Sequence, residues 1–366
     1  MVILFSSILI SALVCEMLLR VIPIPGIEMR CASEFDPDTN LYRYAPNSVI
    51  LKWNVNNELI KRTVNAEGFV DRNHAVEKPA GIYRIGFFGD SYVEAIQMPL
   101  ENTFFRIIEH RLKPFNVETL AFGVNGHGTL HSYLKSKKYA DYFNLDMVVY
   151  VFCENDLGDQ IRDIKSADTD TLPYAEVMND QLIIDNTCSA LYYNKSRWRK
   201  FKNLFYDNSI LFQTIYKRLL LLKKYGLQIL PNKHEIQMST KAGKATTIPR
   251  LGDLPSSWPA PYQVKAKQLG EMVIAQWFTE TRQSNRKFAI LYVPRQTEWY
   301  KKTENQDSWK PWLEQFCQKL NIDFIDPSES FRKFSQAGAQ IYEDHFTAMG
   351  HQAFADCFVE WFKTHK

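Results

Sequence analysis

Six consecutive apolar residues, MVVYVF at positions 147–152, place the strongest constraint on how this chain folds. A strand that lies half exposed alternates polar and apolar residues, whereas a strand that is apolar throughout is buried on both faces. Such strands belong to parallel sheets that are covered by helices on both sides. The chain has 366 residues, of which 45% are hydrophobic, and this is enough for a large core. We therefore expect an α/β fold.

Short apolar strands and longer helices continue on either side of this run. Further strands are predicted at 84–88, 117–122, 288–293 and 323–325, and helices at 103–112, 130–143, 262–282, 309–320 and 348–362. The alternation lapses in the middle of the chain, where we expect a hairpin over 177–184, a helix over 210–222 and a surface loop over 231–261. We interpret residues 81–366 as one domain with an insertion at about 160–261.

The first 22 residues form an almost continuous apolar segment that is stopped by Pro23 and Pro25. About twenty apolar residues span a bilayer as a helix, so this segment is predicted to be a transmembrane anchor or an uncleaved signal sequence. We expect the rest of the protein to lie outside the cytoplasm, in the periplasm. Residues 23–80, which are rich in Pro, Asn and charge, are predicted to be a connecting region packed on the main domain.

Charge and cysteine content argue against several classes of function. The 44 basic and 41 acidic residues are mixed along the chain and leave a net charge of +3, so we expect no nucleic-acid partner. The cysteines, at positions 15, 31, 153, 188, 317 and 357, show neither a CxxC pair nor metal-ligand spacing. No metal site is therefore predicted. The cysteines are either small buried residues or, in an oxidising compartment, partners in one or two disulfides.

Polar or glycine-rich segments follow several of the predicted strands, where parallel sheets carry their active sites. Ser91, after Gly-Asp at the end of the strand at 84–88, is a candidate nucleophile. Gly126 lies in a glycine-rich loop, from which a backbone N–H can donate to an oxyanion. Asn155 directly follows the MVVYVF strand and either offers its side-chain amide as a further donor or caps the next helix.

A further segment, just before the last predicted helix, contains Glu343, Asp344 and His345. A histidine beside a carboxylate can act as a general base, because the acid orients the imidazole and stabilises its charged form. Four such segments at successive strand ends, in this chain order, favour a serine esterase over four unrelated turns.

In these segments the sequence resembles the SGNH/GDSL hydrolase superfamily. The serine block is matched by Gly89-Asp90-Ser91, the glycine block by Gly126, the asparagine block by Glu154-Asn155-Asp156 and the histidine block by His345. The resemblance covers about residues 80–160 and 285–362. It implies a three-layer α/β/α sandwich with a flavodoxin-like parallel sheet, and no cofactor. It also implies Ser91 as nucleophile, His345 as base, and an oxyanion hole made by the backbone N–H groups of Ser91 and Gly126 with the Asn155 side chain.

The residues around His345 depart from the pattern of that superfamily. Its usual acid lies three residues before the histidine, where this chain has Tyr342. A spacing of two, as in related envelope acetyl-transfer enzymes, selects Glu343, whereas a contracted loop selects Asp344. The acid of the catalytic triad is therefore predicted to be either Glu343 or Asp344.

The features together predict a membrane-anchored serine esterase or acyltransferase that acts on small acyl esters, acetyl above all, of cell-envelope carbohydrate. Its expected partners are the ester substrate and, through the N-terminal helix, the membrane. Two alternatives stay open. One is a catalytically inactive envelope component that binds glycan, of which the displaced acid would be a sign. The other is a lipase or thioesterase that works close to the membrane.

Overall fold

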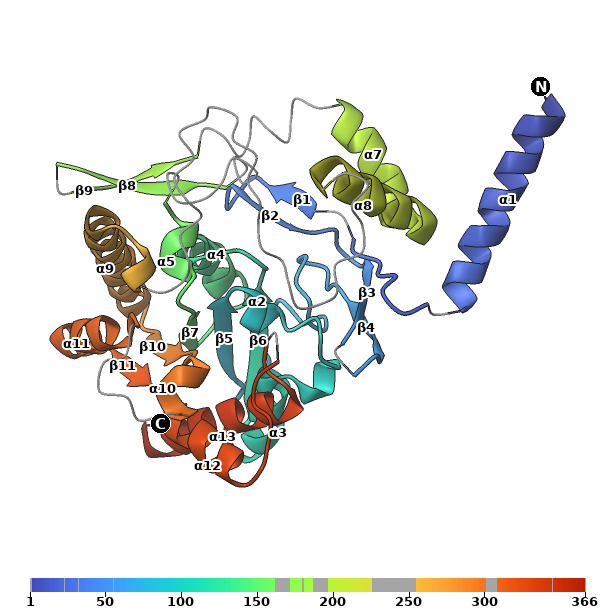
Figure 1. Ribbon diagram of the computed structural model, residues 1–366. Coiled ribbons are helices and arrows are strands. Elements are labelled where there is room, and N and C mark those ends of the chain that lie inside the picture. Colours follow the sequence, from blue (N-terminus) through green and yellow to red (C-terminus); the bar gives the residue numbers. More distant parts are fainter. Residues whose placement is uncertain are drawn as a thin grey trace.

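The computed structural model is built around a five-stranded parallel sheet (Figure 1). Its strands are β5 (Tyr83–Gly89), β6 (Val117–Gly123), β7 (Met147–Phe152), β10 (Lys287–Tyr292) and β11 (Asp323–Ile325). They lie in the order β11-β10-β7-β5-β6, and every pairing is parallel. This is the flavodoxin-like order, in which the second strand along the chain lies outside the first. The predicted strands and the predicted sheet type are confirmed.

The structure describes most of the chain, with several gaps. The described residues are 2–22, 24–31, 33–54, 56–161, 172–179, 181–186, 197–225, 255–300, 308–343 and 345–365. Most of the surface loop predicted over 231–261 lies outside them, and so does Asp344.

Helices cover both faces of the sheet and complete the predicted three-layer sandwich (Figure 1). One face carries α4 (Thr129–Tyr142), α9 (Ala260–Gln283) and α11 (Lys310–Leu320), and the other carries α3 (Phe104–Arg111), α12 (Ser328–Gln336) and α13 (Ala348–His365). Alternate residues of one strand serve the two layers: Val148 and Tyr150 of β7 pack in the first core, and Val149 and Val151 in the second. This double burial explains why the strand is apolar throughout.

The insertion contributes secondary structure of its own. The predicted hairpin is present as β8 (Tyr174–Met178) paired antiparallel with β9 (Gln181–Asp185), and the predicted helix as α8 (Ile210–Tyr225). Helix α7 (Arg197–Asn208) precedes α8, and its bounds were not predicted, nor were those of α12. Both contain few aliphatic residues, and α12 buries only Ser328 and Phe331, so the apolar signal of each helix is confined to a few, mainly aromatic, side chains.

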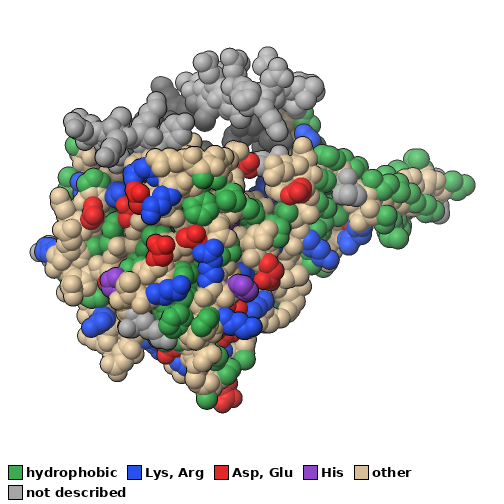
Figure 2. All heavy atoms as spheres, turned by 90° about the horizontal axis from the view of Figure 1, so that it is seen from below, with side chains coloured by type: hydrophobic (Ala, Val, Ile, Leu, Met, Phe, Trp, Pro, Cys, Tyr) green, Lys and Arg blue, Asp and Glu red, His purple; other side chains and the backbone are tan. Residues whose placement is uncertain are grey.

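The predicted membrane segment forms α1 (Val2–Val21), which projects from the body of the protein in both views (Figures 1 and 2). Its stretch Ile3–Val21 has a mean hydropathy of 2.0, and none of it is buried in the protein. It is long and apolar enough to cross a membrane, as a signal sequence also would be. Figure 2 shows acidic and basic side chains interspersed on the face in view, in keeping with the mixed charge of the sequence.

The segment between α1 and the sheet forms two antiparallel hairpins that lie against the main domain. Strand β1 (Ser33–Asp36) pairs with β2 (Leu41–Tyr44), and β3 (Val49–Trp53) pairs with β4 (Leu59–Thr63). From β4 the buried Arg62 guanidinium donates to the carbonyl oxygens of Ala95 at 2.8 Å and Met98 at 2.9 Å. Further along, the buried Asp71 carboxylate accepts from the Ala121 N–H of β6 at 3.0 Å.

Asp71 is expected to make the stability of the fold sensitive to acid. Burial raises the pKa of its carboxyl, but Arg106, His74 and the Ala121 N–H outweigh burial and lower the pKa to about 2. A carboxylate of this kind stabilises the folded state above its unfolded pKa, and loses that contribution as the pH falls through the folded pKa. We expect a contribution of roughly 2 kcal/mol at neutral pH, lost progressively between about pH 4 and about pH 2.

Urea unfolding of the wild type and Asp71→Asn at about pH 7 and about pH 3 measures this contribution. The difference in unfolding free energy between the two proteins should shrink by roughly 1 kcal/mol at the lower pH. A difference that does not change with pH would show that the Asp71 charge does not stabilise the fold.

Candidate active site

Ser91 lies at the point where the strand order of the sheet reverses. It opens α2 (Ser91–Glu94) directly after β5, which lies between β6 and β7. Open α/β sheets bind their ligands at such switch points, beyond the carboxyl ends of the strands. The turn is held by the Asp90 carboxylate, which accepts from the Tyr92 N–H at 2.9 Å. Gly123 lets α2 approach β6, because a Cβ at this position would lie 2.1 Å from the Glu94 backbone nitrogen.

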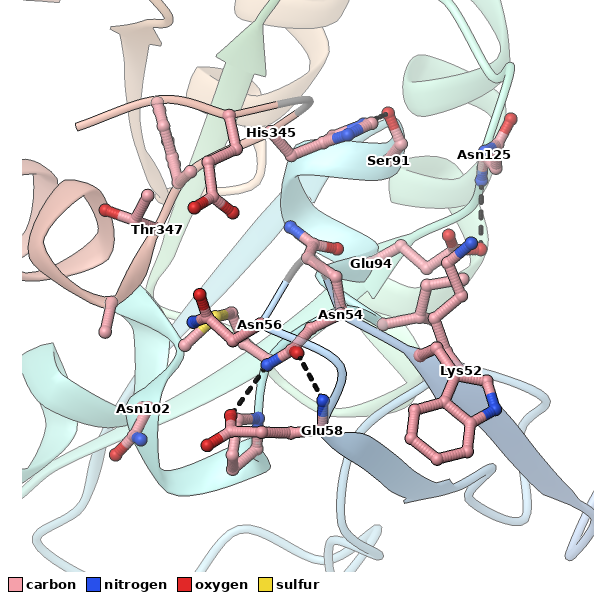
Figure 3. A pocket seen from close by; sticks show the side chains of 18 of the residues that line it. Lys52, Asn54, Asn56, Glu58, Ser91, Glu94, Asn102, Asn125, His345 and Thr347 are labelled. Carbon is pink, nitrogen blue, oxygen red and sulfur yellow. Dashed lines mark hydrogen bonds between the residues drawn. The ribbon is translucent and has the colours of Figure 1, made fainter. Parts of the chain in front are cut away.

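His345 lies 254 residues after Ser91 in the sequence, just before α13. Its Nε2 atom lies 2.8 Å from the Ser91 Oγ atom (Figure 3). The Tyr92 ring packs against the imidazole, with the two ring centroids 5.0 Å apart. This is the contact through which an imidazole can take the proton of a serine hydroxyl. The two residues that the sequence analysis selected as nucleophile and base are therefore hydrogen-bonded neighbours.

The residues before His345 bear on the choice of the acid. Tyr342, at the position of the superfamily's usual acid, donates its hydroxyl to the Pro294 carbonyl. Glu343 is exposed, lines the same cavity as His345, and donates its backbone N–H to the His345 carbonyl at 2.9 Å. Asp344 lies outside the described residues. The assignment of the acid to Glu343 or Asp344 stays a prediction.

The two remaining oxyanion candidates lie near the serine turn. The Asn155 amide nitrogen follows β7 and donates to Asp90 Oδ2 at 3.2 Å and to Asp159 Oδ2 at 3.3 Å. Asn155 is thus hydrogen-bonded to the residue that precedes Ser91. Gly126 has a φ of +75°, in the left-handed region that favours glycine, and it follows Asn125, which lines the cavity. Donation to an oxyanion stays a prediction for both residues.

Charged groups are buried beneath this turn. Burial raises the pKa of the Asp90 and Glu94 carboxyls. The Lys135 ammonium of α4 donates to the Gly89 carbonyl at 2.9 Å and to the Phe122 carbonyl at 2.6 Å, and so joins the ends of β5 and β6. Burial lowers the pKa of Lys135 to about 7, although the neighbouring carboxylates oppose this shift.

The sequence analysis missed Lys135, and the reason is visible in α4. The helix carries lysines at 135, 137 and 138, and the side chains at 137 and 138 keep contact with solvent while Lys135 is buried. Which lysine is buried depends on how the helix is rotated on the sheet. The sequence carries no clear local signal, because three of the four helix positions that neighbour Lys135 are polar, namely His131, Ser132 and Lys138.

Ser91 and His345 border a cavity of about 310 Å³. The β3–β4 hairpin supplies another part of its wall, through Lys52, Asn54 and Glu58 among others (Figure 3). A cavity of this size suits a small ligand. The sequence analysis gave no residue of the hairpin a role, because nothing in that segment marks it as close to a strand end forty residues later.

Two further expectations concern metals and cysteines. Among the residues that the structure describes, no group of three or more His, Cys, Asp or Glu side chains is placed to hold a metal ion. Five of the six cysteines fall in the described ranges, and Cys31 and Cys317 are buried. Cys188 lies outside those ranges.

The chain has distant likenesses among solved structures. No protein-family model and no curated protein matches it. It is similar to the acetyl xylan esterase AlAXEase, with 13% identity, 76% of this chain and 98% of that chain covered, and a TM-score of 0.39. A lipolytic protein of the G-D-S-L family from Veillonella parvula has 11% identity, coverages of 77% and 98%, and a TM-score of 0.39. A catalytic mutant of Axe2, an acetylxylan esterase from Geobacillus stearothermophilus, has 11% identity, coverages of 78% and 95%, and a TM-score of 0.39. Likenesses this distant assign no activity to this chain.

We predict that one of two conservative substitutions will identify the acid. Either Glu343→Gln or Asp344→Asn should lower kcat on an activated acetate ester by on the order of 10³-fold or more, because His345 would lose the partner that sets its tautomer. The other substitution serves as the matched control and should change kcat only slightly. If both variants keep the wild-type kcat, His345 is oriented by some other group.

Proposed function

We propose that this protein is a serine esterase or acyl-transfer enzyme that acts on small acyl esters of carbohydrate. The observation that supports this most directly is the 2.8 Å contact between Ser91 Oγ and His345 Nε2. The contact lies beside a cavity, at the switch point of an open α/β sheet. A buried structural serine would need neither the cavity nor a histidine partner.

In the proposed reaction, His345 Nε2 takes the Ser91 proton as Oγ attacks the ester carbonyl carbon. The tetrahedral intermediate collapses, the bond from the carbonyl carbon to the alcohol oxygen breaks, and His345 returns the proton to the leaving alcohol. Water or a sugar hydroxyl then attacks the acyl-enzyme, with His345 again as base, and Ser91 is regenerated. Water as acceptor makes the enzyme a hydrolase, and a sugar hydroxyl makes it a transferase.

The negative charge of the intermediate would be stabilised by the backbone N–H groups of Ser91 and Gly126 and by the Asn155 amide. Asn155 now donates to Asp90 and Asp159, so it would exchange one carboxylate partner for the oxyanion. If Asn155 left Asp90, the Asp90 carboxylate would keep the Tyr92 N–H as a donor at 2.9 Å.

The substrate class and location are also proposals. Acetyl is the preferred acyl group, and two of the similar structures are acetyl xylan esterases by name. Helix α1 would anchor the enzyme in the membrane, with the catalytic domain on the periplasmic side.

Labelling with a fluorophosphonate probe tests Ser91 and His345 together. The wild type should be labelled, Ser91→Ala should not, and His345→Ala should react at least ~100-fold more slowly, because the hydroxyl loses its base. Ser284→Ala, which changes an exposed serine away from the site, is the matched control. An unlabelled wild type would favour the alternative of a non-catalytic glycan-binding protein.

The acyl preference separates the proposed enzyme from a lipase or thioesterase. We expect kcat/KM for p-nitrophenyl octanoate to be at least ~10-fold lower than for p-nitrophenyl acetate, since polar side chains line much of the cavity and an alkyl chain would desolvate them. Both rates should depend on Ser91. A kcat/KM that rises with acyl length would replace the proposed substrate class with lipids or acyl thioesters.

A further inference from the structure

We propose that the β3–β4 hairpin forms a subsite for the alcohol part of the ester, and that this part is an uncharged sugar. The inference rests on the proposed function and deepens it. It starts from the position of the hairpin, which comes from the segment between α1 and the main domain and yet borders the cavity of Ser91 and His345 (Figure 3). The superfamily motifs lie elsewhere in the chain and imply nothing about this segment.

The chemistry of the wall suits hydroxyl groups. Side-chain amides of Asn54, Asn56, Gln97, Asn102 and Asn125 border the cavity. Each amide offers both donors and an acceptor, which matches a ring of sugar hydroxyls, since each hydroxyl also donates and accepts. An alkyl chain in the same place would displace water from these amides, at a cost in binding free energy.

The charges of the wall argue for an uncharged ligand. Arg30 and Lys52 contribute positive charge, and Glu58 and Glu343 contribute negative charge. The carboxyl of Glu94 also borders the cavity, but it is buried and accepts from the Tyr44 hydroxyl. Lys52 is already paired with Glu28, whose carboxylate lies 2.8 Å from its ammonium. Because the wall carries charges of both signs, it would not select a phosphate or a polycation. Either of these ligands requires an excess of the opposite charge.

Trp53 adds an aromatic surface to the same wall. Its indole N–H donates to the Ile27 carbonyl at 2.9 Å, which orients the ring. An indole held in this way presents a rigid apolar surface next to polar groups, and the apolar C–H face of a sugar ring can pack on it.

The hairpin is fixed relative to the nucleophile. Arg62 of β4 binds the carbonyls of Ala95 and Met98, the residues that follow α2, and Tyr44 donates its hydroxyl to the buried Glu94 of α2. At the hairpin tip, the Asn54 amide donates to Glu58 Oε2 at 2.8 Å, and the Glu58 N–H donates to Asn54 Oδ1 at 2.8 Å. A sugar bound at the hairpin would therefore meet Ser91 at a defined distance, and this kind of positioning accelerates attack.

The test compares two esters of the same acid. For each protein we would measure kcat/KM on fully O-acetylated cellotriose and on p-nitrophenyl acetate, and take the ratio of the two values. Trp53→Ala and Asn56→Ala should each lower the ratio, and the double variant should lower it at least ~10-fold, mainly through a higher KM for the acetylated trisaccharide. Asn56 is exposed, so its substitution should leave the fold intact even if Trp53→Ala weakens it.

Lys61→Ala is the matched control, because Lys61 is an exposed residue of β4 that does not border the cavity. Its ratio should equal that of the wild type. An unchanged ratio in the double variant, or a wild type that cleaves p-nitrophenyl acetate but not the acetylated trisaccharide, would overturn the subsite while the esterase proposal stands. A wild type without Ser91-dependent cleavage of p-nitrophenyl acetate would overturn both.

Discussion

The turn between β5 and α2 is held in place by buried polar groups, and the geometry of the site depends on them. Lys135 binds the carbonyl at the end of β5, the Asp90 carboxylate binds the first turn of α2, and Asn155 binds Asp90. A buried polar group that loses its partner costs about 1–3 kcal/mol, so the contacts of Lys135 and Asp90 with the backbone resist displacement. Ser91 therefore emerges at one position relative to the sheet, and a histidine on a distant loop can meet it.

The same turn connects the site to the segment that precedes the sheet. Glu94 is buried and hydrogen-bonded to Tyr44, and Arg62 binds the backbone just after α2. This segment is thus more than a spacer between α1 and the main domain. It forms part of the cavity wall. The shape of the cavity therefore depends on this segment and on the main domain together. A flavodoxin-like sheet alone leaves its switch point open, whereas here a hairpin borders it.

Sequence patterns predicted the sheet well because its signals are local. Strands buried on both faces are short, apolar and bounded by polar turns. The sequence MVVYVF therefore predicts such a strand without information about the rest of the chain. Ser91 and His345 could be selected for a related reason, since parallel strands bring their carboxyl ends to one edge. The bounds of helix α7 were not predicted because its few apolar residues, mostly aromatic, are interrupted by basic and polar ones.

The sequence by itself determined the fold class, the strands of the central sheet with most of the helices that cover it, and the pair of residues that meet at the switch point. Only the tertiary structure decided that Lys135 is buried beneath the site, that Asn155 binds Asp90, and that the β3–β4 hairpin borders the cavity. The first group depends on hydrophobic periodicity and on the geometry of parallel sheets, which act over a few residues or apply to every such sheet. The second depends on how a helix is rotated and where a hairpin docks, and both follow from the packing of surfaces far apart in the chain.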